Sequence, residues 1–355
     1  MTCIIIFVYW NEAMIFSWLM ICTLAAQPKE FVLGAGGDIA FGRYLKSGLY
    51  RPHGGETPFS DLKRLFSQAD LVFANLETPL QNVDPPHVHP PKNSLTFRAD
   101  LQYAQHMKTA GLDLLSLANN HMEDCTLTGI SHTQDALSAA GIHYGGANMQ
   151  KDPYEPVIFE HQGTEIVFFA RSTKRNHGSI SRHPYIAFER AKDIHATAPQ
   201  IIQKYKKIYP SALFIFSLHW GAEYSSFPVS IQRSIAHVLI DSGVHAVLGH
   251  HPHVLQPVET YKDGVILYSM GNLLFDQFRS ETQKGAFFYL HFAYQKDWSL
   301  NKIRIVPLKV LPPPNTTEIS KDTNTLMKFE HNSTKKRYST TFQWKGEELL
   351  WFKTP

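Results

Sequence analysis

The chain has 355 residues, of which 43% are hydrophobic, 18% charged and 12% aromatic. This composition can build a large core, and it excludes a disordered, collagen-like or coiled-coil protein. With 34 basic and 31 acidic residues the formal net charge is only +3, so the chain lacks the basic surplus of a nucleic-acid-binding protein and we expect no nucleic-acid partner. Nineteen histidines need an explanation, because imidazole binds metals and transfers protons near neutral pH.

The first predicted segment, residues 1–26, is a leader. Apolar runs at 3–10 and 13–26 are followed by Gln27, as in a signal peptide. The second run has 14 residues, fewer than the roughly 20 that span a bilayer, which favours cleavage over an uncleaved membrane anchor, although no basic residue precedes Lys29. In both cases we expect an exported protein that is periplasmic, extracellular or membrane-anchored.

Residues 27–310 have the pattern of one α/β layered domain, in which short apolar runs alternate with segments of helical period. One helix is predicted after the Thr57-Pro58 cap, and another around 231–239. Strands are predicted at 31–35, 71–74, 112–117, 166–170, 212–218, 245–248 and 265–269, with late antiparallel strands at 286–294 and 302–310.

Residues 311–355 differ in composition from this domain. Three consecutive prolines at 312–314 precede a stretch rich in Thr, Asn, Ser and Lys, which indicates a Pro-rich linker and a polar tail. Residues 344–352 carry enough apolar side chains to dock, either on the domain or on a partner.

Five predicted strands end directly in polar motifs. In open α/β sheets, ligands bind beyond the carboxyl ends of the strands, so motifs far apart in sequence converge there. The sequence therefore predicts one site at this edge. The motifs are Gly37-Asp38, Asn75-Leu76-Glu77, Asn119-Asn120-His121, His219-Trp220-Gly221 and Gly249-His250-His251-Pro252-His253.

Carboxylates, amide oxygens and imidazoles together form the ligand set of a divalent metal site. Two ions roughly 3.5 to 4 Å apart can clamp the attacking and leaving oxygens in phosphoester hydrolysis. His121 and His250 are then expected to act as acid and base, or to support the ligands. The expected metal ligands are Asp38, Glu77, Asn120, His219, His251 and His253.

Each motif also has an ordinary structural explanation. Asp38 alone can belong to a turn, Asn119-Asn120-His121 can cap a helix, and His219 can be a hydrogen-bonded core histidine. The motif at 249–253 fits such an explanation least, since three imidazoles in four residues are costly to bury without partners. Arg43 either meets an anionic substrate or pairs with a local carboxylate.

Taken in order over residues 31–295, these motifs, with Gly42-Arg43 and Gly271-Asn272, resemble the signatures of the CapA (PgsA) family of capsule and poly-γ-glutamate synthesis proteins. That family is similar to the calcineurin-like metallophosphoesterases. The resemblance implies a four-layer αββα sandwich with a dinuclear site of Mn, Fe or Zn at the carboxyl ends of the strands. It also implies that Arg43, Asn75 and Asn272 contact the substrate.

Carried over residue by residue, the resemblance assigns each motif a role. Asp38 corresponds to the first aspartate of the phosphoesterases and Glu77 to the bridging aspartate. Asn120 and His121 correspond to the Asn-His pair, His219 to the isolated metal histidine, and His251-Pro252-His253 to the terminal His-x-His. Ala40 stands where the phosphoesterases have a histidine, and no Asp-Arg-Gly follows Glu77, so one metal position is short of a ligand.

Three functions remain open for the predicted site. The first is an exported metal-dependent hydrolase of the phosphoesterase type that acts in capsule or poly-γ-glutamate synthesis or export. The second is a non-catalytic accessory protein that holds anionic polymer at the cell surface. The third is hydrolysis or transfer of γ-glutamyl amide bonds. The expected partners are an anionic polymer or phosphoester substrate and membrane-bound capsule-synthesis proteins.

Overall fold

The computed structural model describes residues 29–42, 58–81, 96–312, 316–335, 338 and 340–353. The expected leader at 1–26 and the candidate substrate contact Arg43 lie outside these residues.

The larger sheet has ten strands, and its central part is parallel. β1 pairs in parallel with β2, β2 with β3, and β3 with β4, while β1 pairs antiparallel with β12, and β12 with β13. Its order is β15-β16-β13-β12-β1-β2-β3-β4, with β11 beside β1 and β14 beside β13. The strands are β1 (Lys29–Ile39), β2 (Leu71–Leu76), β3 (Leu114–Ser116), β4 (His143–Gly145), β11 (Asn272–Leu274), β12 (Lys284–Tyr294), β13 (Trp298–Lys309), β14 (Glu318–Ile319), β15 (Gln343–Lys345) and β16 (Glu348–Phe352).

The smaller sheet has six strands in the order β5-β6-β7-β8-β10-β9. Its four inner strands are parallel, and the two edge strands, β5 and β9, are antiparallel to their neighbours. The inner strands are apolar almost throughout, as expected for parallel strands buried on both faces. The strands are β5 (Val157–His161), β6 (Thr164–Ser172), β7 (Leu213–His219), β8 (Ala246–His250), β9 (Val258–Tyr261) and β10 (Gly264–Leu267).

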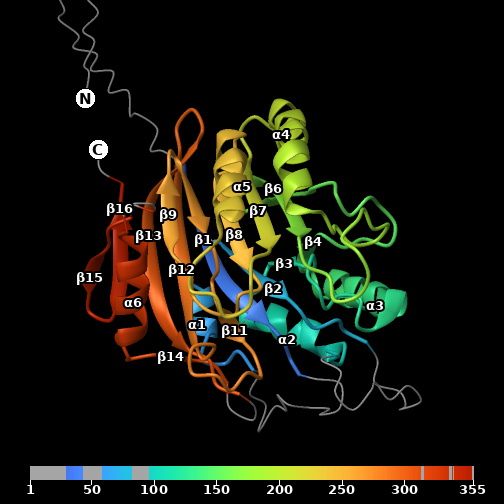
Figure 1. Cartoon of the computed structure of the whole chain (residues 1–355), viewed down its shortest axis with the longest axis horizontal. Coiled ribbons are helices and arrows are strands. Elements are labelled where there is room, and N and C mark those ends of the chain that lie inside the picture. Colours follow the sequence, from blue (N-terminus) through green and yellow to red (C-terminus); the bar gives the residue numbers. More distant parts are fainter. Residues whose placement is uncertain are drawn as a thin grey trace, which may run out of the picture.

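Helices cover the outer face of each sheet, which makes four layers (Figure 1). The helices are α1 (Lys63–Phe66), α2 (Gln102–Ala110), α3 (Thr126–Ala140), α4 (Ala191–Ile208), α5 (Ser230–Asp241) and α6 (Asn324–Ser333). Helices α1 to α3 pack on the larger sheet through side chains such as Met107 and Ile130, and α4 and α5 pack on the smaller one through Ile202 and Leu239. The predicted four-layer α/β sandwich is confirmed.

The two sheets face each other across an apolar core. Successive side chains of a strand point to opposite faces, so in β1 Phe31, Leu33 and Ala35 point into this core while Val32 packs against the helical layer. Phe168 of β6 and Leu248 of β8 meet them from the smaller sheet. The parallel strands of both sheets are thereby stacked, and their carboxyl ends come together.

Most of residues 311–355 belong to the domain, where the sequence predicts a linker and a polar tail. β16 pairs antiparallel with β13, and α6 contributes Leu326 and Phe329 to the core between the sheets. Figure 1 shows α6, β15 and β16 together at one end of the larger sheet. The apolar residues near 349 complete the edge of β13 that would otherwise remain open, so residues 344–352 dock on the domain, one of the two places expected for them. The boundary at 310 stays a prediction.

Across the described ranges, none of the helices is both long enough and apolar enough to cross a membrane.

Candidate metal centre

The predicted motifs meet at one edge of the sandwich, as the sequence predicts. Asp38 lies near the end of β1, Glu77 and Asn120 follow β2 and β3, and His219 and His250 are the last residues of β7 and β8. All five are buried, with exposed fractions between 0% and 5%. Parallel strands of both sheets thus deliver their terminal polar side chains to one place.

Two motif glycines permit the close backbone contacts that shape this edge. A Cβ atom on Gly37 would lie 2.0 Å from the carbonyl oxygen of Gly271, and one on Gly249 would lie 2.1 Å from that of Tyr268. A larger residue would push these segments apart. Each glycine directly precedes a site residue, so its small size places Asp38 and His250 within contact of each other.

Asp38 is the centre of the hydrogen-bond network. Its Oδ1 atom is 3.0 Å from Nδ1 of His250 and accepts from Nδ2 of Asn75 at 2.9 Å, and its Oδ2 atom is 3.2 Å from Nδ1 of His253. Burial opposes ionisation, but the hydrogen bonds from His250 and His253 outweigh it and hold the pKa of Asp38 well below its usual value. Asp38 is therefore a buried, ionised carboxylate.

Glu77 has the opposite electrostatic character. Its Oε1 atom is 3.3 Å from Nδ2 of Asn75 and 3.8 Å from Nδ1 of His219, whereas its buried Oε2 atom has no partner among the described residues. Burial and the negative charge of Asp38 raise the pKa of Glu77 well above its usual value. Two buried carboxyl groups this close repel each other when both are ionised. A positive charge between them would remove this repulsion.

His219, Asn120 and His251 form the part of the site that faces the smaller sheet. Nε2 of His219 contacts Oδ1 of Asn120 at 2.7 Å, and the His219 and His251 rings lie 4.8 Å apart. Burial, with the charge of His251, lowers the pKa of His219, and burial, with the charge of His253, lowers the pKa of His251 to about 3. Both rings are therefore neutral at physiological pH, which is the form that binds metal.

His121 lies at the rim of the cluster. Its Nδ1 atom is 2.8 Å from Oδ2 of Asp124, and its ring stacks on Phe97 with the centroids 4.0 Å apart. Asn176 links this histidine to the ligands, because its Oδ1 atom accepts from Nδ2 of Asn120 at 2.8 Å and its Nδ2 atom lies 3.5 Å from Nδ1 of His121.

The two described candidate substrate contacts, Asn75 and Asn272, are fully buried inside the network. Asn75 donates to Asp38 and accepts from Asn119 at 3.3 Å, and Oδ1 of Asn272 is 3.1 Å from Nδ1 of His253. In this structure both amides orient other site residues. Their contact with a substrate stays a prediction.

The residues fit a divalent cation. One ligand atom each from Asp38, Glu77 and His253 lie within 4.8 Å of one another, and Glu223, His251 and His253 form a second such group. Within the site, three buried atoms have no partner among the described residues, namely Oε2 of Glu77, Nε2 of His250 and Nδ1 of His251. Because buried polar atoms are nearly always paired, such a concentration of unpaired nitrogen and oxygen donors indicates a missing ligand.

Sequence reasoning missed several residues of the site. Glu223, Asp124 and Asn176 all lie in loops, and each reaches the cluster through the fold rather than through a strand end. For Glu223 a signal was present, since this carboxylate follows the His219-Trp220-Gly221 motif by two residues.

Ala40 occupies an apolar wall of the site. It is fully buried with Phe97, Phe275 and Val310, so no donor comes from this position. The Phe275 ring lies 4.8 Å from the His253 ring, as Phe97 does against His121 at 4.0 Å. Where the phosphoesterases have a metal-binding histidine, this chain therefore has Ala40. The phenylalanines beside Ala40 pack against the rings of His121 and His253.

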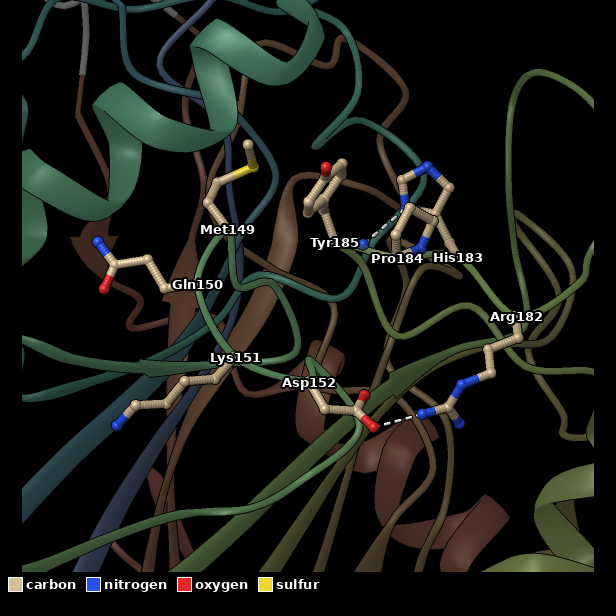
Figure 2. A pocket seen from close by; sticks show the side chains of 8 residues that line it. All are labelled: Met149, Gln150, Lys151, Asp152, Arg182, His183, Pro184 and Tyr185. Carbon is tan, nitrogen blue, oxygen red and sulfur yellow. Dashed lines mark hydrogen bonds and ion pairs between the residues drawn. The ribbon is translucent and has the colours of Figure 1, made fainter.

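Two of the hollows on the described surface differ in their relation to the site. One of about 340 Å³ is lined by Tyr224, Asp276, Gln277, Phe278 and Arg279, and it borders the site because the Tyr224 and His253 rings are 6.4 Å apart. The other, of about 530 Å³, is formed by residues 149–152 and 182–185. Figure 2 shows Arg182 paired with Asp152 in this second hollow, which contains none of the predicted metal ligands.

Comparison with known proteins places these motifs in context. Residues 32–277 match a family model described as bacterial capsule synthesis protein PGA_cap. The chain is 29% identical over 312 residues to the capsule biosynthesis protein CapA of Bacillus anthracis, covering 83% of this chain and 72% of that protein. It is 25% identical over 320 residues to the PGA biosynthesis protein CapA of Bacillus subtilis (strain 168), covering 88% and 79%. Among solved structures, sulfate thiohydrolase SoxB of Thermus thermophilus aligns with a TM-score of 0.41 and 10% identity over 86% of this chain and 60% of that chain, which is too weak a likeness to support an argument.

Proposed function

This chain belongs to the bacterial capsule synthesis protein family PGA_cap, and on that premise we propose that it is an exported, metal-dependent hydrolase that acts on a capsule polymer or a phosphoester precursor. The observation that carries the proposal is the buried cluster of Asp38, Glu77 and His253, whose ligand atoms lie within 4.8 Å of one another. A buried N and O donor set of this kind suits a divalent cation such as Mn, Fe or Zn.

The residues divide into cation ligands and groups that hold them. Asp38, Glu77, Asn120, His219, His251 and His253 would hold two cations, which supply Lewis-acid stabilisation of the charge that develops during hydrolysis. His250 is fully buried and contacts Oδ1 of Asp38, so it orients this carboxylate and keeps it ionised. Asn75 spans Asp38 and Glu77 and fixes their spacing.

His121 is the residue that we assign to proton transfer. It is 7% exposed and lies at the rim, and its Nδ1 atom is engaged by Asp124. A carboxylate on Nδ1 fixes the orientation of the ring and keeps a proton on that nitrogen. As an imidazolium, His121 can then give the proton on Nε2 to a leaving group, which leaves the neutral ring with its lone pair on Nε2.

A purely polymer-holding role would require free cationic side chains near the site. In the loop beside Asn176, Arg175 instead makes two 2.8 Å hydrogen bonds to Glu123, and Arg182 pairs with Asp152. These two arginines are therefore engaged by carboxylates, whereas the charge of Lys174 reaches His251 and Arg279 lines the hollow beside Tyr224, so a polyanion could still be held next to the metal site. Hydrolysis or transfer of a γ-glutamyl amide would use the same ligands and is the second candidate, since two relatives are named for capsule and PGA biosynthesis.

The test combines metal analysis with two hydrolysis assays on the purified chain. Wild type, Asp38→Ala and His251→Ala are compared, with His331→Ala in α6 as an exposed-histidine control. We expect wild type and the control to carry metal, and the two site variants to bind it more than about 100-fold more weakly, because even residues that only support a ligand contribute 10- to 100-fold.

Hydrolysis of bis(p-nitrophenyl) phosphate and of a short poly-γ-glutamate then separates the two chemistries. Cleavage of the phosphodiester by wild type alone supports the phosphoesterase, and cleavage of the polymer alone supports the amidase. Equal metal content in wild type and the site variants would remove the basis of the hydrolase proposal.

A further inference from the structure

The loop after β7 brings a carboxylate, Glu223, to the predicted ligands. One of its oxygens lies within 4.8 Å of ring nitrogens of both His251 and His253. Its charge also reaches the interior, since Glu223 contributes, after burial and Asp38, to raising the pKa of Glu77. Glu223 itself is exposed, so it stands at the mouth of the site.

The loop at residues 220–224 is fixed at both ends to the segment at residues 250–253. The Trp220 backbone N–H donates to the carbonyl oxygen of His250 at 3.1 Å, and the Tyr224 backbone N–H donates to that of Pro252 at 2.8 Å. The Trp220 indole N–H also donates to the carbonyl oxygen of Tyr268 at 3.0 Å. Glu223 is thus held beside His251 and His253 by backbone contacts that do not depend on its own side chain.

Backbone strain concentrates at the same place. Tyr224, His251 and His253 have φ values of 61°, 92° and 58°, a region that residues other than glycine seldom adopt. Such strain persists only where surrounding structure enforces it, and it clusters at ligand sites. The three side chains lie close together, since the His253 ring is 6.4 Å from that of Tyr224 and 6.0 Å from that of His251.

Both histidines present a lone pair suited to a cation. His251 is buried, and its Nδ1 atom has no partner among the described residues. Nδ1 of His253 lies 3.2 Å from Oδ2 of Asp38 and 3.1 Å from Oδ1 of Asn272, two acceptors, so this nitrogen carries the proton and Nε2 keeps the lone pair.

We propose that Glu223 is a metal ligand, which together with His251 and His253 holds a divalent cation at the mouth of the site. Two imidazoles and one carboxylate form a donor set known for zinc, with positions left open for substrate or water. The proposal rests on the proposed metal-dependent function and adds to it an exposed ligand that a substrate would meet first.

The experiment is a calorimetric titration of the metal-stripped full chain with Zn²⁺, in wild type, Glu223→Gln and Glu347→Gln. Glu347 is an exposed glutamate in the turn between β15 and β16, so it receives the same substitution away from the cluster. Because Glu223 is exposed, its substitution leaves the core intact, which thermal unfolding of the metal-free variants verifies. The visible absorption of Co²⁺-loaded protein gives a second readout of the ligand set.

We expect Glu223→Gln to lose one Zn²⁺ equivalent, or to bind it at least tenfold more weakly, with an altered Co²⁺ spectrum, while Glu347→Gln matches wild type. If wild type binds Zn²⁺ and Glu223→Gln binds it with equal stoichiometry and affinity, the assignment of Glu223 is overturned and the metal-dependent function stands. If wild type binds no Zn²⁺, both proposals fail.

Discussion

The two ends of strand β8 carry histidines in opposite chemical situations. At the amino end, Nδ1 of His245 accepts a hydrogen bond from the Phe214 backbone N–H at 2.9 Å, and Nε2 lies 3.2 Å from Oδ1 of Asp297. Lys206 completes the group by donating to both oxygens of Asp297 at 2.9 Å. Each ring nitrogen of His245 has a partner, so this is a structural histidine.

At the carboxyl end, five residues later, some ring nitrogens have no partner among the described residues. His250 uses Nδ1 for Asp38, but its buried Nε2 atom has no partner in the described chain, and the same holds for Nδ1 of His251. Both ends are buried to a similar degree, so burial does not separate them. The difference is the number of unpaired nitrogens, and only the carboxyl end has donors left for a ligand.

The largest expected effect comes from removing the histidine that both candidate ligand groups share. His253→Ala takes one donor from each group, so we expect metal affinity to fall by more than about 100-fold. His245→Ala, at the other end of the strand, should bind metal like wild type. Equilibrium dialysis of the two variants against a competing chelator measures this difference.

If His245→Ala loses as much metal as His253→Ala, the proposed difference between the two ends of β8 is wrong. That result would mean that the carboxyl-end geometry depends on the whole strand, and that the two ends are not independent.

The next largest effect is on stability, and it is expected from His245→Ala at the amino end rather than from a substitution at the carboxyl end. His245→Ala leaves the buried Phe214 N–H unpaired and separates Asp297 from the strand, so we expect the free energy of unfolding of the metal-free protein to drop by about 1–3 kcal/mol. Urea denaturation in the presence of a chelator provides the measurement. A loss below a few tenths of a kcal/mol would show that water or a neighbouring group takes the place of the imidazole.

Sequence patterns predicted the carboxyl end well, for a physical reason. Parallel strands read as apolar runs, and where such a run ends in Asp38, Glu77 or His219 the polar residue must lie at the sheet edge. The nine predicted strands are all present, and the five motifs meet. Shorter or edge strands such as β5, β9 and β16 were missed, because their burial depends on the element they pair with.

The sequence could not show how each side chain is paired. His245 and His250 belong to the same strand pattern, and only the approach of Asp297 from the turn between β12 and β13 distinguishes them. Glu223 likewise acquires its place from the backbone contact between Tyr224 and Pro252. Local patterns therefore locate the ends of strands, whereas hydrogen bonds between distant loops decide which of the end residues are free to bind.

The smallest expected effect is a change with pH in the loss of unfolding free energy that His245→Ala causes. It tests whether His245, at the amino end of β8, is neutral. Burial lowers the pKa of His245, with the hydrogen bond to Asp297 opposing it. A histidine whose folded pKa lies below the unfolded value of about 6.5 binds its proton more readily in the unfolded chain. Its contribution to stability is therefore complete above about pH 6.5 and is lost as the pH falls towards the folded pKa, by at most about 1.4 kcal/mol per pH unit.

The difference in unfolding free energy between wild type and His245→Ala should accordingly shrink from pH 7 to pH 5. Urea denaturation of both metal-free proteins at pH 7, 6 and 5 measures it, and the contributions of the other histidines cancel because both proteins share them. A difference that grows on acidification would mean that His245 is a charged imidazolium paired with Asp297. The amino end would then be held by an ion pair, and the contrast along β8 would lie in charge as well as in unpaired nitrogens.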